Sequence, residues 1–131
     1  MDSAWKVGIA VGIGGATGAV CRYIVGLYAA ALGPCSTLLV NVVGSLLLGM
    51  LMGYSLKRKV KEWRKAGIGT GFCGGLTTMS AFSKEVVHLI EQGDVLIGIG
   101  YAAVSVSGSL LCCFVGIRIG TLAGRRRSTW K

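Results

Sequence analysis

Four long apolar segments, separated by short polar stretches, make up most of this chain of 131 residues. Each segment exceeds the roughly 20 apolar residues that a helix needs to cross the hydrocarbon core of a bilayer. The pattern therefore predicts an all-α membrane protein, with residues 1–131 forming a single domain of four transmembrane helices. We expect these helices over about residues 7–32, 35–56, 66–90 and 95–122.

The third apolar segment contains a stretch that is unfavourable for a continuous helix. Residues 71–83 read GFCGGLTTMSAFS, in which the paired glycines Gly74 and Gly75 precede the β-branched Thr77 and Thr78. Paired glycines and β-branched residues both lower helix propensity. Backbone that leaves a helix within a membrane must be buried in protein or line a watery cavity. The sequence thus predicts a third helix that is broken mid-membrane, where free carbonyls suit a small cation and free amides suit an anion.

Composition supports a membrane protein. The chain is 53% hydrophobic and only 15% charged, whereas about a quarter of the residues in an average soluble domain are charged. Its 22 glycines lie among Leu, Val and Ile, which is typical of membrane helices whose backbones pack closely. A signal peptide is the alternative for the first apolar segment, but that segment is too long for a signal-peptide core.

Basic residues concentrate on one side of the predicted helices. The net charge is +9, and every Lys and Arg except Arg22 and Lys84 lies before the first helix, between the second and third, or near the end of the fourth. The opposite loops carry Glu91 and Asp94 instead. The positive-inside rule then predicts a multi-pass membrane protein with both termini in the cytoplasm. Anionic lipid headgroups, rather than nucleic acid, are the expected partners of these charges. The basic residues are Lys6, Lys57, Arg58, Lys59, Lys61, Arg64, Lys65, Arg118, Arg125, Arg126, Arg127 and Lys131.

Residue types that carry out catalysis or bind metals form no recognisable site. The five cysteines lack CxxC spacing, are odd in number and lie mostly within apolar segments. We interpret them as packing residues rather than metal ligands or disulfide partners. There is no nucleophile–base pair, and the glycines lack the strand–loop–helix setting of a phosphate-binding loop. The sequence therefore predicts a protein that is not an enzyme.

Two predicted helices carry a stripe of polar residues at intervals of four. Residues at this spacing share one helix face. Such stripes either form interhelical hydrogen bonds or line a pathway for a polar solute. Two stripes in one small protein favour the pathway. They consist of Thr37, Asn41 and Ser45 in the second helix, and of Tyr101, Ser105 and Ser109 in the fourth.

Two further polar residues of the apolar segments have open interpretations. Arg22 shares a face of the first helix with Gly14, Gly18 and Gly26, and it either steers anions towards a pore mouth or extends to the membrane interface. His88 lies near the outer end of the third helix. We interpret it as an interfacial residue rather than as a ligand or proton carrier.

The residues that follow the predicted break suit an anion. In a helix that begins there, Met79 and Phe82 share one face, and Ser80 and Ser83 lie on a neighbouring one. A phenylalanine ring has a positive edge. Ring-edge hydrogens and hydroxyls together can replace part of the hydration shell of an anion, although ordinary packing is the alternative for Met79 and Phe82.

The stretch GFCGGLTTMSAFS resembles the central motif of the Fluc/CrcB fluoride channels, GGLTTFSTFS. The similarity extends to Arg22, to TLLVNVVGSLLLG in the second helix, and to the spacing of Tyr101, Ser105 and Ser109. It covers essentially the whole chain. The resemblance implies a fluoride-specific ion channel of the plasma membrane, which exports cytoplasmic fluoride passively and relieves fluoride toxicity.

The resemblance also implies an assembly and a set of site residues. Channels of this family are antiparallel dimers with two narrow fluoride pathways and a structural sodium ion at the dimer centre. By position, the backbone carbonyls of Gly74 and Thr77 would hold the sodium ion, and Glu85 matches an acid of the family. The fluoride pathway would comprise Asn41, Met79, Ser80, Phe82, Ser83, Tyr101, Ser105, Ser109 and Arg22.

The chain departs from the family pattern in three respects. Met79 replaces the first phenylalanine of the motif, and Ala81 replaces the usual threonine. Methionine keeps the bulk of the ring but lacks its quadrupole. The charge asymmetry is the third departure, because a chain that inserts in one orientation needs an oppositely oriented partner to form an antiparallel dimer. We therefore hypothesise a heteromeric channel, with a homodimer that tolerates the asymmetry as the rival.

Two other functions remain alternatives. A small multidrug-resistance-type antiporter is also a four-helix dimer, but it depends on a membrane-embedded acid in its first helix, where this chain has Arg22 and no acid. The second alternative is a scaffold or a poorly conducting partner subunit of a heteromeric fluoride channel, which Met79 favours.

Overall fold

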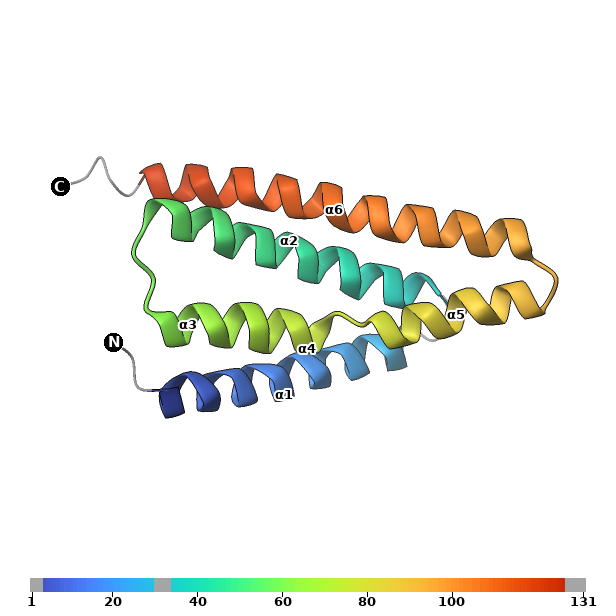
Figure 1. The fold of residues 1–131 in the computed structure, drawn as a ribbon, viewed down its shortest axis with the longest axis horizontal. Coiled ribbons are helices and arrows are strands. Elements are labelled where there is room, and N and C mark those ends of the chain that lie inside the picture. The colour runs from blue at the N-terminus through green and yellow to red at the C-terminus, as the bar shows by residue number, and fades with distance from the viewer. Residues whose placement is uncertain (1–3, 30–33, 127–131) are drawn as a thin grey trace.

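The computed structural model describes residues 4–29 and 34–126, which are almost entirely helical (Figure 1). The predicted all-α fold class is confirmed. The helices, in chain order, are α1 (Ala4–Tyr28), α2 (Cys35–Lys57), α3 (Glu62–Ala66), the π-helix η2 (Gly67–Cys73), α4 (Gly74–Leu76), α5 (Met79–Glu91) and α6 (Val95–Arg126).

Three of these helices are long and apolar enough to cross a membrane, namely α1, α2 and α6. The third predicted span instead comprises a continuous helical run of α3, η2 and α4, followed by the separate helix α5. This run begins at Glu62 rather than near residue 66, and α6 extends to Arg126 rather than ending near residue 122. Helix α1 ends at Tyr28, and the predicted continuation over residues 30–32 lies outside the described residues.

Helices α2 and α6 lie side by side along their length (Figure 1). Their close approach depends on glycines from both helices, because a Cβ atom at Gly49 would overlap the backbone carbonyl of Cys113 on α6. Reciprocally, a Cβ atom at Gly116 would overlap the carbonyl of Leu46 on α2. Glycines on both helices therefore allow the backbones of α2 and α6 to approach each other closely.

A second pair is formed by α1 and the run of α3, η2 and α4. Gly14 and Gly18 of α1 lie directly against this run, and a Cβ atom at Gly18 would overlap the carbonyl of Phe72. Arg22 continues the same face, whereas Gly26 has no neighbouring atom within 4 Å of a built Cβ. The predicted packing face therefore ends at Arg22.

The two ends of the bundle differ in charge. The α2–α3 connection, the start of α1 and the end of α6 lie at one end, and the α5–α6 turn lies at the other (Figure 1). The first end holds the basic run of residues 57–65. There, the Nε atom of Arg58 donates a hydrogen bond of 3.1 Å to the carbonyl of Gly124 on α6, where a cation complements the negative end of the helix dipole.

Candidate functional site

Two residues with extended backbone separate α4 from α5. Thr77 has φ −77° and ψ 156°, and Thr78 has φ −147° and ψ 127°. The N–H and the Oγ1 hydroxyl of Thr77 both donate to the carbonyl of Cys73, at 3.0 and 2.9 Å. These bonds satisfy the last turn of the first helical run, after which the chain leaves the helix.

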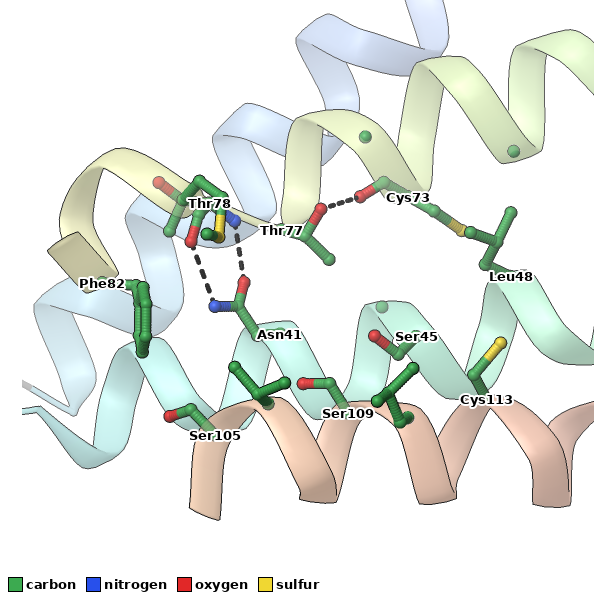
Figure 2. A pocket seen from close by; sticks show the side chains of 16 residues that line it. Asn41, Ser45, Leu48, Cys73, Thr77, Thr78, Phe82, Ser105, Ser109 and Cys113 are labelled. Atoms are coloured by element: carbon green, nitrogen blue, oxygen red, sulfur yellow. Dashed lines mark hydrogen bonds between the residues drawn. The ribbon is translucent and has the colours of Figure 1, made fainter. Parts of the chain in front are cut away.

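The side-chain amide of Asn41, on α2, binds both backbone polar groups of Thr78 (Figure 2). Its Nδ2 atom donates to the Thr78 carbonyl at 3.0 Å, and its Oδ1 atom accepts from the Thr78 N–H at 2.7 Å. One side chain thus replaces the hydrogen bonds that a neighbouring strand would supply. Sequence reasoning placed Asn41 in a polar stripe but missed this double contact.

Thr78 also begins the next helix. Its Oγ1 accepts a hydrogen bond of 3.3 Å from the backbone N–H of Ala81 and lies 3.2 Å from the hydroxyl of Ser80. A threonine in this N-cap position satisfies one of the free N–H groups of a helix start. The pair Thr77-Thr78 therefore ends one helix and caps the other.

Arg22 reaches the same place from α1. Its Nη1 atom donates to the carbonyl of Thr77 at 3.2 Å. Asn41 and Arg22 come from different helices, so two side chains distant in sequence hold the two extended residues.

Backbone carbonyls at the interruption are the oxygen atoms to consider for a small cation. The Gly74 carbonyl would accept from the N–H of Thr78 in a continuous helix, but that N–H is bound to Asn41. The Thr77 carbonyl points to Arg22. Hard cations prefer such oxygen ligands. Among the described residues, no group of three or more His, Cys, Asp or Glu side chains could hold a metal ion.

A cavity of about 510 Å³ lies beside the interruption, between α2, α6 and the two halves of the third span (Figure 2). None of its lining residues is charged. The lining comprises Asn41, Gly44, Ser45, Leu48, Gly69, Cys73, Gly74, Thr77, Thr78, Met79, Phe82, Ser105, Val106, Ser109, Leu110 and Cys113.

One polar atom of this cavity has no partner in the part of the chain that the structure describes. The Oγ atom of Ser105 is buried without a hydrogen bond, and the residue is only 3% exposed. A buried, unsatisfied hydroxyl is costly unless a ligand or water completes it. Ser105 of α6 and Phe82 of α5 both line the cavity (Figure 2), so this hydroxyl marks a place for a hydrogen-bond acceptor or donor.

Glu85 joins three helices near this cavity. Its two carboxylate oxygens accept hydrogen bonds of 2.6 Å, one from the hydroxyl of Thr37 on α2 and one from that of Tyr101 on α6. The ring of Tyr101 also packs against Phe82, with 5.7 Å between centroids. Thr37 and Tyr101 each belong to a polar stripe, but no sequence pattern indicated that both bind one carboxylate.

The structure brings together only part of the predicted set. Within the described residues, five of the nine predicted pathway residues line the cavity, namely Asn41, Met79, Phe82, Ser105 and Ser109. Ser80 and Ser83 are exposed outside it, Tyr101 is bound to Glu85, and Arg22 approaches from α1. Among the lining residues that were not predicted, Ser45 could have been found, because it belongs to the polar stripe of the second helix. No sequence pattern could have indicated Leu48, Cys73 and Cys113, because they are ordinary apolar residues of a membrane helix.

An apolar helical bundle in which an interrupted helix borders an uncharged cavity defines a membrane protein that handles small ions or solutes. The chain belongs to the family described as CrcB-like protein, Camphor Resistance (CrcB), whose sequence pattern matches residues 9–117.

Curated relatives cover nearly the same region. A protein of Pseudomonas fluorescens (strain Pf0-1), named fluoride-specific ion channel FluC, is 43% identical over 119 residues, which cover 87% of this chain and 96% of the relative. A fluoride-specific ion channel FluC 2 of Bacillus licheniformis is 47% identical, with 86% and 85% covered. The FluC 2 of Bacillus subtilis (strain 168) is 42% identical, with 88% of each chain covered.

Proposed function

We propose that the protein is a fluoride-specific ion channel through which cytoplasmic fluoride leaves the cell passively. The observation that carries the proposal is the uncharged cavity beside the interruption, which combines the amide of Asn41, the ring of Phe82 and the unpartnered hydroxyl of Ser105. These groups suit a small anion, and no carboxylate lines the cavity to repel it. The relatives named as fluoride-specific ion channels support the same function.

The mechanism follows from replacement of water by protein groups. A fluoride ion gives up part of its hydration shell in a narrow path, and hydroxyl hydrogens of Ser105 and Ser109 take the place of water. The edge of the Phe82 ring adds a weak positive contact. Because no fixed cation lines the cavity, binding stays weak enough for the ion to leave, as conduction requires.

The membrane potential drives the export. A potential that is negative inside favours outward movement of an anion by about 2.3 kcal/mol per charge for each 100 mV. Hydrogen fluoride that enters a cell dissociates at neutral pH, so a passive channel lowers cytoplasmic fluoride without coupling to another gradient. This relieves fluoride toxicity.

The test is an efflux measurement on the purified full-length protein in liposomes loaded with potassium fluoride or potassium chloride. Valinomycin supplies the compensating potassium flux, and ion-selective electrodes follow each anion. Fast fluoride release without chloride release supports the proposal. Equal release of both anions contradicts fluoride specificity. If the preparation releases neither anion, an oppositely oriented homologue is added to test whether the channel is a heteromer.

We further propose that an antiparallel second protomer completes the cavity. The open side of the interruption supports this assembly, because Met79 is 70% exposed and Gly74 is exposed as well. We place the interruption mid-membrane, where an exposed polar backbone needs a protein partner. Crosslinking of single cysteine variants at Met79 in membranes tests the pairing, and a chain that stays monomeric while conducting fluoride contradicts it.

A structural sodium ion is proposed at the centre of this dimer, held by the carbonyls of Gly74 and Thr77. The donor chemistry fits, since carbonyl oxygens suit a hard cation and the Gly74 carbonyl has lost its helical donor to Asn41. Each chain offers two such oxygens, so two chains offer four. The ion would supply a positive charge that joins the carbonyl ends of the two interrupted helices.

The channel is proposed to lie in the plasma membrane. The charge distribution supports an orientation with both termini in the cytoplasm. Only Arg22 and Lys84 lie outside the basic regions of the cytoplasmic side. Antiparallel pairing then calls for a homologue with the opposite bias, so we propose a heteromeric channel. Labelling of a terminal tag from both faces, in a protein expressed alone that conducts fluoride, contradicts the heteromer and supports the homodimer.

Two alternatives are tested by the same preparations. An antiporter of the small multidrug-resistance type needs an acid in its first helix, and α1 (Ala4–Tyr28) contains none. A poorly conducting partner subunit is favoured by Met79 in place of an aromatic ring. It would release little fluoride alone and would raise the flux of the oppositely oriented homologue.

A further inference from the structure

The first turn of α1 lies beside α3 at the basic end of the bundle. The two helices are in contact and run in the same direction (Figure 1). A Cβ atom at Gly67, the first residue after α3, would lie 3.1 Å from the Cβ of Ala10 on α1. One turn nearer the start of both helices, Lys6 of α1 is therefore level with Trp63 and Arg64 of α3. Two basic residues that are distant in sequence thus share one end of this helix pair.

Each of these two cations lies over the ring of the tryptophan that precedes it. The Nζ atom of Lys6 is 5.6 Å from the centre of the Trp5 ring, and the Cζ atom of Arg64 is 5.1 Å from that of the Trp63 ring. These are cation–π distances. Such a contact limits where the cation lies but leaves its N–H groups available to a hydrogen-bond acceptor.

No carboxylate neutralises either cation in the part of the chain that the structure describes. The side chains of Lys6 and Arg64 form no ion pair and no hydrogen bond there, and both residues are exposed. Glu62 is the one acid of α3, and the basic residues Lys61 and Lys65 lie close to it in sequence. Two exposed cations with free donors suit a phosphate group, whose oxygens accept charge-assisted hydrogen bonds.

The adjoining surface of α1 is apolar and suits a hydrocarbon chain. Trp5, Ile9 and Ile13 recur every four residues, so they lie along one side of the helix, and they are 64%, 53% and 65% exposed. Because α1 is long and apolar enough to cross a membrane, this stripe leads from the basic end towards the hydrocarbon core. The surface therefore combines a place for an anion with a place for an acyl chain.

We propose that the first turn of α1 and the helix α3 together form a binding site for an anionic phospholipid. Lys6 and Arg64 bind the phosphate of its headgroup, and one acyl chain lies along Trp5, Ile9 and Ile13. The orientation proposed above places this site in the inner leaflet, where anionic lipids make the membrane surface negative. The site differs from a diffuse attraction of basic residues to that surface, because two positioned cations from separate helices bind one headgroup. It does not depend on which ion the channel conducts.

The experiment measures the preference of the full-length protein for phosphatidylglycerol over phosphatidylcholine in mixed vesicles. The phosphatidylglycerol carries bromine atoms near the headgroup end of an acyl chain, which quench the fluorescence of nearby tryptophans. The chain has three tryptophans, so all proteins carry Trp130→Phe and only Trp5 and Trp63 report. Fluorescence in fully brominated phosphatidylcholine gives the limit of complete quenching for each protein.

The site variant combines Lys6→Gln with Arg64→Gln. The matched control combines Lys59→Gln with Arg125→Gln, which removes the same charge from the same end of the bundle. Lys59 lies in the α2–α3 connection and Arg125 at the end of α6, and both are exposed.

A basic residue near an anionic surface strengthens binding by a factor of about five. We therefore expect Lys6→Gln and Arg64→Gln each to weaken phosphatidylglycerol binding by about this factor, and the site variant to lose most of the preference. The control variant should stay within about twofold of the wild type. A wild type that does not prefer phosphatidylglycerol overturns the proposal, and so does a control variant that loses as much preference as the site variant.

Inorganic phosphate, added at constant ionic strength, tests whether the occupant is a lipid. It should leave the quenching by brominated phosphatidylglycerol unchanged, because phosphate alone lacks the apolar contact with α1. Loss of quenching on addition of phosphate contradicts a phospholipid as the occupant and indicates a site for the free anion.

Discussion

At the scale of single residues, Asn41 determines the geometry of the interruption most directly. Its amide offers one donor and one acceptor to Thr78, at 3.0 and 2.7 Å. No other neutral side chain of similar size supplies both groups in this arrangement. The same residue lines the cavity, so its second amide hydrogen is available to an anion.

Replacing Asn41 by aspartate tests this double role. In Asn41→Asp the carboxylate still accepts from the Thr78 N–H, but it loses the donor and places a negative charge near the Thr78 carbonyl. We expect the free energy of unfolding to fall by about 1–3 kcal/mol and fluoride efflux to fall by a factor of ten or more. Ser45→Ala, one turn along the same helix and also in the cavity lining, is the matched control and should remain close to wild type in stability.

A substitution of Ser105 tests its role in fluoride efflux separately from its effect on stability. Its Oγ atom is buried without a partner in the described part of the chain, so Ser105→Ala breaks no internal hydrogen bond. We expect unchanged or slightly higher stability, because a buried unsatisfied group is removed, together with clearly slower fluoride efflux. Ser107→Ala is the control, since Ser107 is exposed and, among the described residues, bonds only to the carbonyls of Ala103 and Val104 in its own helix. Equal efflux from both variants would remove Ser105 from the pathway.

Met79 lines the cavity and is a position at which the chain departs from the motif of its family. It is 70% exposed in the single chain and lies on the cavity lining. Met79→Phe supplies a ring with a positive edge, and we expect faster fluoride efflux and tighter fluoride binding than in wild type. Met52→Phe, at an exposed position of α2 away from the cavity, should change neither. A slower Met79→Phe variant would indicate that this position serves packing alone.

At the scale of elements, the sequence indicated where the third span is weak as a helix, but not which residues leave it. Gly74 and Gly75 are helical in α4, and the extended residues are Thr77 and Thr78. Gly75 serves close packing instead, because a Cβ atom there would overlap the carbonyl of Gly15 on α1. Tertiary packing thus overrides the low helix propensity of the glycines.

The π-helix η2 could not be predicted from local sequence. Residues 67–73 read GIGTGFC, a glycine-rich stretch that is compatible with several helical forms. This stretch packs closely against α1, where Gly71 lies against Val11 and Gly14. The contacts of Asn41 with Thr78, and of Thr37 and Tyr101 with Glu85, were equally hidden, because each joins helices that only the tertiary fold brings together.

Glycine packing between α1 and the third span gives a prediction with an internal control. A Cβ atom at Gly18 would overlap the carbonyl of Phe72, whereas Gly12, on the same helix, has no atom within 4 Å of a built Cβ. We expect Gly18→Ala to lower the free energy of unfolding by about 1–3 kcal/mol through overpacking. Gly12→Ala should be neutral or raise it by at most about 1 kcal/mol. Chemical unfolding in detergent measures both, and equal stabilities would contradict the close approach of these helices.

At the scale of the whole molecule, charge and hydrophobicity were the properties that the sequence specified best. The apolar segments correspond to helices, and the basic residues of the α2–α3 connection lie at the same end as the start of α1 and the end of α6 (Figure 1). The cavity was harder to foresee, because most of its lining is apolar and chemically inconspicuous. Its open side is a property of the single chain, which is why we propose that a second protomer completes it.

The reversal potential of a reconstituted bilayer, with fluoride on one side and chloride on the other, tests the central claim most directly. The purified protein, alone or with an oppositely oriented homologue, is recorded under this gradient at equal potassium on both sides. A fluoride-specific channel should give a current whose reversal potential approaches the fluoride limit, with negligible chloride current. A reversal potential near zero, which indicates equal permeability to both anions, would contradict fluoride specificity and with it the account of the cavity.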